Sequence, residues 1–189
     1  MEENGTHERN AGIDVRASPQ ELREGLVTLL PRLRRFARAL TRDAHDADDL
    51  VQIAVERALT RAGQLRPDAP LSSWMFGIVR NAWLDELRAR GRRARLFAPA
   101  ESGEQVGDAS QGAHADLLAV QDALARLPEE QRAAVALVLI EGLSYKEAAH
   151  IMQVPIGTLT SRLARGREAL QEMLGETTGA LPGTSATRL

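Results

Sequence analysis

The feature that most constrains this chain is the helical spacing of its apolar residues. Along residues 22–40, a large apolar side chain recurs at steps of three or four, at Leu22, Leu26, Leu29, Leu33, Phe36 and Leu40. That spacing places all six side chains on one face of an α-helix. Aromatic residues make up only 3% of the chain, and β-branched residues form no strand-like runs. The sequence therefore predicts an all-α fold.

Start and stop signals divide the chain into a series of helices. The sequence SPQE at 18–21 is typical of a helix start, and SYKE at 144–147 is a capping box that opens a short helix through Met152. Pro31 predicts a kink or a division of the first helix. A second helix is predicted to follow the acidic residues 46–49. Further helices are predicted at about 71–90, 116–127, 128–142 and 156–174.

A change of composition at residues 96–115 separates two halves. The segment loses the helical periodicity and contains Gly, Ser, Pro and Ala, which predicts a linker. A flexible chain of this length has an end-to-end distance of roughly 25 Å and stretches to about 65 Å. We therefore expect a disordered tail at 1–17, a helical domain at 18–95, the linker at 96–115, a second helical domain at 116–174 and a disordered tail at 175–189.

Positive charge is concentrated in the first half of the chain. The formal net charge is −2, but residues 31–95 carry fourteen arginines against eight acidic residues. The densest group consists of five arginines within eight residues: Arg88, Arg90, Arg92, Arg93 and Arg95. Such a group suits a phosphate backbone. Cations at the C-terminal end of a helix also stabilise the helix dipole, and this stretch alone favours neither interpretation.

The last two predicted helices have the proportions of a helix–turn–helix. On a helical wheel of residues 156–174, one narrow apolar sector would pack against the preceding helix: Leu159, Leu163, Gly166 and Leu170. A second sector offers hydroxyl and guanidinium groups, which suit phosphates and guanine edges in a major groove: Thr158, Ser161, Arg162 and Arg165. An ordinary helical hairpin with a solvated face is the alternative, but the combination favours DNA binding.

Other classes of function receive little support from the sequence. The chain has no cysteine, which excludes disulfides, iron–sulfur clusters and cysteine zinc sites. The acidic residues Asp43, Asp46, Asp48 and Asp49 lack the glycine and final glutamate of a calcium loop, so we expect helix capping or a protein contact there and no metal. Neither a catalytic constellation nor a cofactor motif is present. The absence of a long apolar run or a visible signal peptide predicts a cytoplasmic protein without membrane insertion.

Two ordered sets of motifs resemble the extracytoplasmic-function (ECF) sigma factors of the sigma-70 family. Region 2 of that family is similar to LPRLRRFA at 30–37, DADDLVQ at 46–52 and SWMFGIVRN at 73–81. Region 4 is similar to LPEEQR at 127–132, EGLSYKEAA at 141–149 and GTLTSRLARGR at 157–167. Each motif alone is suggestive, whereas both sets in this order are highly specific and cover almost all of residues 19–174.

The resemblance implies a factor that binds bacterial core RNA polymerase, at its β′ clamp helices and β flap, and directs it to promoter DNA. Residues matching the clamp-binding helix are Asp49, Leu50, Gln52 and Glu56. Residues matching the segments that capture the opening −10 element are Arg66, Asp68, Arg80, Asn81, Arg88, Arg92 and Arg93. Residues matching the reader of the −35 duplex are Thr158, Thr160, Ser161, Arg162 and Arg165. The family further implies an anti-sigma factor as a partner, and a role in a stress or envelope response.

The chain departs from the family pattern at Ile53 and Thr160, and its first helix is unusually basic around Arg35. Ile53 stands where the clamp-binding helix usually has an acid, and Thr160 stands where the recognition helix often has Lys or Arg. Two alternative functions also remain. One is a sigma-like decoy that occupies an anti-sigma factor, although such mimics typically carry a receiver domain for which this chain has no room. The other is a repressor that uses only the helix–turn–helix, which would leave residues 74–81 and the clamp-like helix unexplained.

Overall fold

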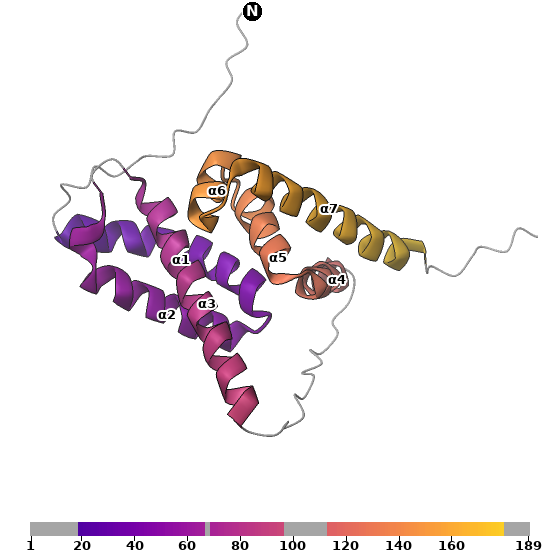
Figure 1. Ribbon diagram of the computed structural model, residues 1–189, viewed down its shortest axis with the longest axis horizontal. Coiled ribbons are helices and arrows are strands. Elements are labelled where there is room, and N and C mark those ends of the chain that lie inside the picture. Colours follow the sequence, from indigo (N-terminus) through magenta and orange to yellow (C-terminus); the bar gives the residue numbers. More distant parts are fainter. Residues whose placement is uncertain (1–18, 67–68, 97–112, 180–189) are drawn as a thin grey trace, which may run out of the picture.

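The computed structural model describes residues 19–66, 69–96 and 113–179, and every regular element in these ranges is helical. The first half contains α1 (Pro19–Thr41), α2 (Ala44–Thr60), the short 3-10 turn η1 (Ala62–Gln64) and α3 (Leu71–Leu96). The second half contains α4 (Ala113–Arg126), α5 (Glu129–Val135), the π-helical turn η2 (Ala136–Ile140), α6 (Tyr145–Met152) and α7 (Ile156–Gly179). Figure 1 shows this arrangement, which confirms the predicted all-α fold.

The first half is a bundle in which α1 packs against α2 and α3. The apolar stripe of α1 faces this core, where Leu33, Phe36 and Leu40 are completely buried. The rings of Phe36 and Phe76 meet edge to face, with their centroids 5.3 Å apart. This geometry is favoured by the quadrupoles of the two rings. The apolar residues that the sequence predicts on one face of α1 therefore form part of the core.

The turn between α1 and α2 is fixed by hydrogen bonds of its own residues. The Asp43 side chain accepts a hydrogen bond of 2.8 Å from the backbone N–H of Asp46, and so caps the N-terminus of α2. The Thr41 hydroxyl donates to the Asp43 carbonyl at 2.8 Å. Asp43 thus serves as the helix cap that the acidic cluster predicts.

The second half contains the expected pair of short helices. The Ser144 hydroxyl accepts from the N–H of Glu147, and the Glu147 carboxylate accepts from the N–H of Ser144, which confirms the capping box. At the other end of α6, Gln153 adopts a left-handed conformation with φ of 55° and turns the chain toward α7. Leu159 and Leu163 of α7 are buried, as the helical wheel predicts.

Several predicted boundaries are wrong. Pro31 does not divide the first helix: α1 is continuous, and because both Pro31 and Val27 are exposed, water can bind the Val27 carbonyl that the proline leaves without a partner. The α7 helix continues to Gly179, so residues 175–179 are not a disordered tail. Leu96 and residues 113–115 are helical, which shortens the candidate linker. The predicted tail at 1–17, residues 180–189 and the linker between 97 and 112 lie outside the described residues.

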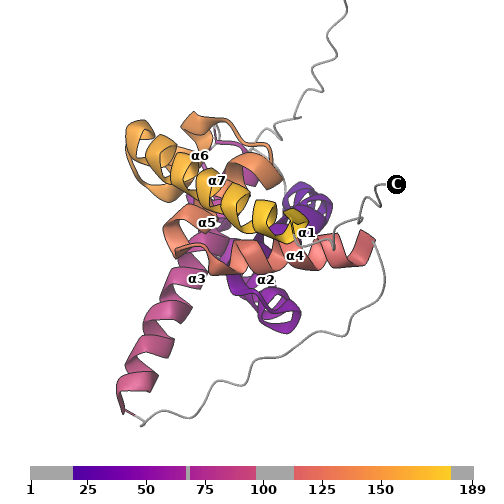
Figure 2. The same cartoon turned by 90° about the vertical axis from the view of Figure 1, so that its right-hand side faces the viewer.

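The two halves are in contact, which the sequence does not predict. Helix α3 packs against α6, and α1 packs against α4, α5 and η2. Figures 1 and 2 show that the C-terminal part of α3 nevertheless projects away from the other helices. No helix within the described ranges combines the length and the apolar character needed to span a bilayer. The shared contact therefore brings the two predicted DNA-binding halves side by side.

We expect Gly166→Ala to destabilise the second half, because α7 approaches α5 closely at this glycine. A Cβ atom at Gly166 would lie 2.8 Å from Cγ2 of the buried and stiff Val135 side chain. Overpacking of this kind costs about 1–3 kcal/mol in the free energy of unfolding, which urea denaturation measures. Gly175→Ala, on the same helix but with no atom within 4 Å of the added Cβ, is the control. It should leave stability unchanged or raise it by up to about 1 kcal/mol, and equal effects of the two substitutions would contradict the packing described.

Candidate nucleic-acid and polymerase interfaces

The predicted polymerase-binding residues on α2 form one exposed face, with one exception. Asp49, Gln52 and Glu56 are exposed, and the Gln52 amide donates to the Glu56 carboxylate at 3.1 Å. Ile53, which is 43% exposed, lies next to them. Leu50 is only 4% exposed and packs in the bundle core, so in this conformation it supports α2 and is not offered to a partner. The face is acidic and amide-bearing, with one apolar side chain added.

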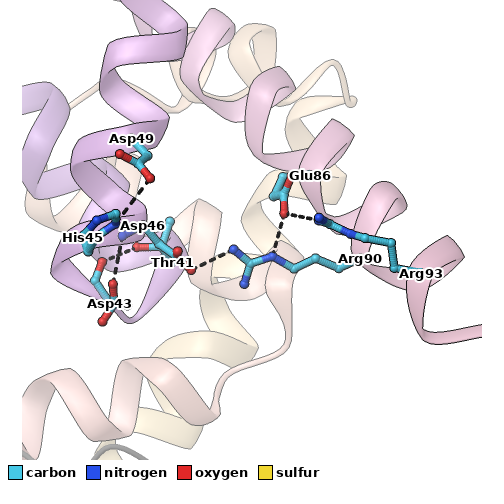
Figure 3. Close-up of polar contacts among 8 residues, drawn as sticks. All are labelled: Thr41, Asp43, His45, Asp46, Asp49, Glu86, Arg90 and Arg93. Carbon is cyan, nitrogen blue, oxygen red and sulfur yellow. Dashed lines mark hydrogen bonds and ion pairs between the residues drawn. The ribbon is translucent and has the colours of Figure 1, made fainter. Parts of the chain in front are cut away.

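The arginines near the end of α3 differ in how firmly they are held. Figure 3 shows Arg90 between the Asp46 carboxylate of α2, at 2.7 Å, and the Glu86 carboxylate, at 2.8 Å. The Arg90 guanidinium also lies over the Trp83 ring, 5.6 Å from its centroid. Arg93 binds Glu86 at 2.7 Å. Arg90 is therefore a structural link between α2 and α3, and it positions the projecting end of α3.

Other arginines of the same helix end are available to a ligand. Arg92 and Arg95 are exposed, and within the described part of the chain neither has a hydrogen bond or ion pair. Arg88 is 65% exposed and makes only a surface ion pair with Asp85, at 3.2 Å. Such exposed pairs contribute little to stability, so a phosphate can replace the carboxylate. The sequence alone does not distinguish these arginines from Arg90, because all of them lie in one arginine-rich stretch.

Charge pairing shifts the pKa values of two groups at this site. The hydrogen bond from Arg90, followed by the positive charges of Arg90 and Arg93, holds the pKa of the Glu86 carboxyl below its ordinary value, despite partial desolvation. The hydrogen bonds to Glu86 and Asp46 raise the pKa of Arg90. Glu86 therefore remains ionised and keeps two guanidinium groups in place.

The remaining residues of the predicted −10 set lie in different environments. Asn81 and Arg66 are exposed, and Asp68 lies outside the described residues. Arg80 is a correction to the expectation of a free phosphate-binding cation, because its side chain is 9% exposed and its guanidinium lies 3.6 Å from the Glu130 carboxylate. Sequence periodicity does not reveal this pairing, since Glu130 belongs to the other half of the chain.

The predicted −35 residues lie along α7, on the side away from its buried leucines. Thr160 and Ser161 are exposed, and their hydroxyls donate to carbonyls of their own helix, at 2.9 Å each. Arg165 is exposed, whereas Thr158 is partly buried. Arg162 is 26% exposed in its side chain and pairs with Glu130 at 2.8 Å, so in this conformation it is not free to bind DNA.

Sequence patterns did not predict the group of residues that joins the two halves. Glu141 binds Arg32 and Arg35 of α1, and the Trp83 indole N–H donates to Glu129 at 2.5 Å. Glu141 and Glu129 belong to motifs that resemble region 4, but nothing in those motifs indicates a partner in the first half. A long-range pairing of this kind has no local signal in the sequence.

We expect Glu86→Gln to lower the melting temperature at neutral pH and to reduce its pH dependence. Because the pKa of Glu86 is lower in the folded state than the ordinary value of 4.5, its contribution to stability is complete above that value. It is lost as the pH falls through the lowered folded pKa. Thermal unfolding of the two proteins should therefore differ at pH 7 and converge at acidic pH. A difference that grows on acidification would contradict this prediction.

Comparisons with known proteins agree with this architecture. The family model described as Sigma-70 region 2 matches residues 26–93, and the model described as Sigma-70, region 4 matches residues 117–170. The ECF RNA polymerase sigma factor SigM of Mycobacterium tuberculosis is 44% identical over 144 residues, which cover 76% of this chain and 72% of SigM. The ECF RNA polymerase sigma factor EcfG of Rhodopseudomonas palustris is 35% identical over 153 residues, covering 81% of this chain and 84% of EcfG.

Two solved structures share this fold. The sigma factor RpoE of Bartonella quintana, determined with the anti-sigma factor NepR, superposes with a TM-score of 0.76 at 33% identity. The superposition covers 82% of this chain and 98% of RpoE. CnrH, determined with the cytosolic domain of CnrY, shares the fold with a TM-score of 0.65 at 24% identity, over 86% of this chain and 93% of CnrH. With the two family models matching consecutive halves, the chain belongs to the ECF sigma factors of the sigma-70 family.

Proposed function

We propose that this sigma factor docks on core RNA polymerase through the exposed face of α2. Asp49, Gln52 and Glu56 provide carboxylate and amide groups that suit a basic helical surface, such as the β′ clamp helices. Ile53 adds apolar contact area where a charge is usual in the family. By the same resemblance, the second half would contact the β flap.

The projecting end of α3 is proposed to hold the −10 element. Arg88, Arg92 and Arg93 lie on this end, and Arg92 has no partner within the described ranges, so it can bind a strand backbone directly. Asn81 is exposed on the same helix and carries both a donor and an acceptor for a base edge. Arg66 and Asp68 precede α3 in the sequence, in the segment that matches the family's acceptor of a flipped base. Arg80 joins this set only after it leaves Glu130.

The helix–turn–helix of α6 and α7 is proposed to read the −35 duplex. The observation that carries this proposal is the exposed polar row on α7, where Thr160, Ser161 and Arg165 face away from the buried Leu159 and Leu163. Hydroxyls and a guanidinium in that position suit phosphates and base edges in a major groove. Thr158 and Arg162 lie in the same turns and complete the surface.

The two halves are proposed to act as tethered modules. Promoter elements about 17 bp apart are separated by roughly 58 Å on B-DNA, and an extended chain of residues 97–112 could bridge much of that distance. Tethering two weak DNA contacts raises the effective affinity of the pair. The factor would work in the cytoplasm, where core polymerase and promoters are found, and an anti-sigma factor would hold it inactive.

Run-off transcription with core polymerase on fragmented genomic DNA tests this function. We expect discrete new transcripts with the parent factor and at least a tenfold loss with Arg162→Ala plus Arg165→Ala, because both guanidiniums are proposed DNA contacts. Arg126→Ala is the matched control, since Arg126 forms only an exposed pair with Asp122 on α4. A decoy would give no transcripts with either protein and would still bind an anti-sigma factor.

Charge reversal on α2 tests the polymerase contact separately. Asp49→Arg plus Glu56→Arg should weaken binding to core polymerase by at least tenfold in fluorescence anisotropy, because the acidic face then repels a basic surface. Asp48→Arg is the control, since it changes the charge of the same helix at a carboxylate that pairs with Arg34 of α1. Equal losses in the control and the double variant would show that net charge, and not this face, determines the affinity.

A further inference from the structure

The second half of α1 carries a basic surface that the proposed function leaves unused. Residues 32–42 contain five arginines and no acidic residue. Arg32 is directed inward, where it binds the buried Glu141 carboxylate at 3.0 Å. The other four are exposed, and we refer to them as the basic ridge: Arg34, Arg35, Arg38 and Arg42. Every exposed residue from 34 to 42 is therefore an arginine.

The ridge arginines are only partly neutralised by other residues. Arg34 shares an exposed pair with Asp48 at 3.2 Å, and such pairs contribute little to stability. Arg35 reaches Glu141 at 3.3 Å, but its side chain remains 55% exposed. Arg38 and Arg42 make no side-chain hydrogen bond or ion pair with any residue that the structure describes. At least two guanidinium groups of the ridge are thus available to a ligand.

Arg42 stands at a position where an arginine destabilises the fold. It follows the last residue of α1 with φ of 70°, and its backbone N–H donates to the Arg38 carbonyl at 3.2 Å. Glycine is usual at such a helix end, because a Cβ atom disfavours the left-handed conformation. Burial lowers the pKa of the neighbouring Arg132, and the positive charge of Arg42 lowers it further. A residue that costs stability in two ways and has no partner of its own points to a function for its side chain.

The ridge ends close to the basic end of α3. Arg42 precedes Asp43, whose side chain accepts from the backbone N–H of Asp46 at 2.8 Å. Asp46 in turn binds Arg90 of α3 at 2.7 Å, as Figure 3 shows. A short series of contacts therefore connects the end of the ridge to the helix end that carries the unpaired Arg92. The two sets of guanidinium groups form neighbouring parts of one basic region.

The chemistry of the ridge suits the backbone of double-stranded DNA. Phe36, the aromatic residue within the segment, is completely buried, so the ridge offers no ring on which an unpaired base can stack. It also lacks the apolar centre that a protein interface usually has. Arg34 and Arg38 are one turn apart, about 6 Å along α1, and every second phosphate of a strand lies about 6.8 Å further along the duplex axis. Guanidinium groups bind phosphate oxygens with two parallel hydrogen bonds.

We propose that the basic ridge binds the phosphate backbone of the duplex that adjoins the −10 element. Contacts of this kind fix the position of a duplex without reading its sequence. The ridge would therefore hold the DNA in register beside the end of α3, which is proposed to capture the opening strand. The binding of phosphates rests on the residues of α1 alone, whereas the place beside the −10 element rests on the proposed function.

The salt dependence of DNA binding measures these phosphate contacts. The free protein is titrated in fluorescence anisotropy with a duplex of about 20 bp that contains no promoter element, starting at low salt. Arg38→Gln plus Arg42→Gln should make the slope of log K against log salt less steep by about 1.8, since each phosphate contact contributes about 0.9. At the lowest salt concentration the double variant should bind at least threefold more weakly, with unchanged helicity in circular dichroism.

Arg23→Gln plus Arg126→Gln is the matched control, because it removes the same charge from two exposed positions outside the ridge. Arg23 lies at the other end of α1, and Arg126 forms only an exposed pair on α4. The control should keep the slope of the parent. Equal slopes for the parent and the ridge variant would overturn the proposal, as would an equal change in the control or no duplex binding by the parent. Loss of affinity for core polymerase with an unchanged DNA slope would assign the ridge to an acidic protein surface instead.

Arg42→Gly separates the stability of the fold from DNA binding. The substitution relieves the left-handed backbone and removes a positive charge near Arg132, so it should raise the melting temperature by about 2–4 °C. It should also reduce the salt slope by about 0.9. A more stable protein with the slope of the parent would exclude Arg42 from the phosphate contacts and so contradict the proposal.

Directed DNA cleavage tests the place of the ridge on the promoter. Because the chain has no cysteine, an iron chelate that generates hydroxyl radicals can be attached at Ala44→Cys, an exposed position two residues after Arg42. In the polymerase complex, on a promoter identified by the transcripts above, it should cut the duplex that adjoins the −10 element. Thr28→Cys, exposed at the other end of α1, should not cut there.

Absence of these cuts from Ala44→Cys, with transcription intact, would overturn the assignment to this duplex. If the parent drives no transcription, the proposed function fails. The salt slopes of the free protein would then still decide whether the basic ridge binds phosphates.

Discussion

The arrangement of this molecule depends on the pairing of the buried Glu141 carboxylate with two arginines of α1. Without these cations the contact between the halves would contain an uncompensated charge in a buried site. With them, α1 and η2 stay together. Glu129 then accepts a hydrogen bond from Trp83 of α3, and Glu130 lies beside Arg80 of the same helix. The pairing of Arg80 with Glu130 accompanies this contact between the halves, whereas Arg162 pairs with Glu130 within the second half.

The polar surfaces are positioned by two small cores. In the first half, the stripe of α1 around Leu33 and Phe36 fixes α2 and α3, and so fixes both the acidic face and the basic end. In the second half, the close approach at Gly166 sets α7 against α5 and turns Arg165 outward. Function in a protein of this kind lies in exposed side chains, but their spacing is determined by buried ones.

Local features of this fold were predictable from the sequence because they depend on neighbouring residues. Helical spacing identified the α1 stripe, and the Ser144–Glu147 capping box gave the start of α6. The predicted division of the first helix at Pro31 was wrong. The free-energy cost of a proline inside a helix depends on solvent access to the carbonyl left without a partner, here that of Val27, and periodicity alone does not reveal this access. The extension of α7 through Gly179 was missed because Gly175 and the polar residues around it lack helical periodicity.

The candidate sites were predicted in part, for the same physical reason. Helical phase placed Arg165 on an exposed face, and the family resemblance indicated Asp49 and Gln52, which are exposed on α2. Leu50 is buried in the bundle core, although the family motif includes it among the clamp-binding residues. The pairing of Arg80 with Glu130 joins residues fifty positions apart in the chain, and no local pattern specifies it.

Hydroxyl-radical footprinting of the polymerase bound to a promoter tests most directly the claim that one chain reads two separate DNA elements. We expect two protected upstream segments centred about 17 bp apart, roughly 58 Å along the duplex. Protection of the upstream segment alone should disappear when Arg162 and Arg165 are replaced by alanine. A single protected segment, or loss of both segments together while the polymerase remains bound, would contradict the assignment of the two halves to separate elements.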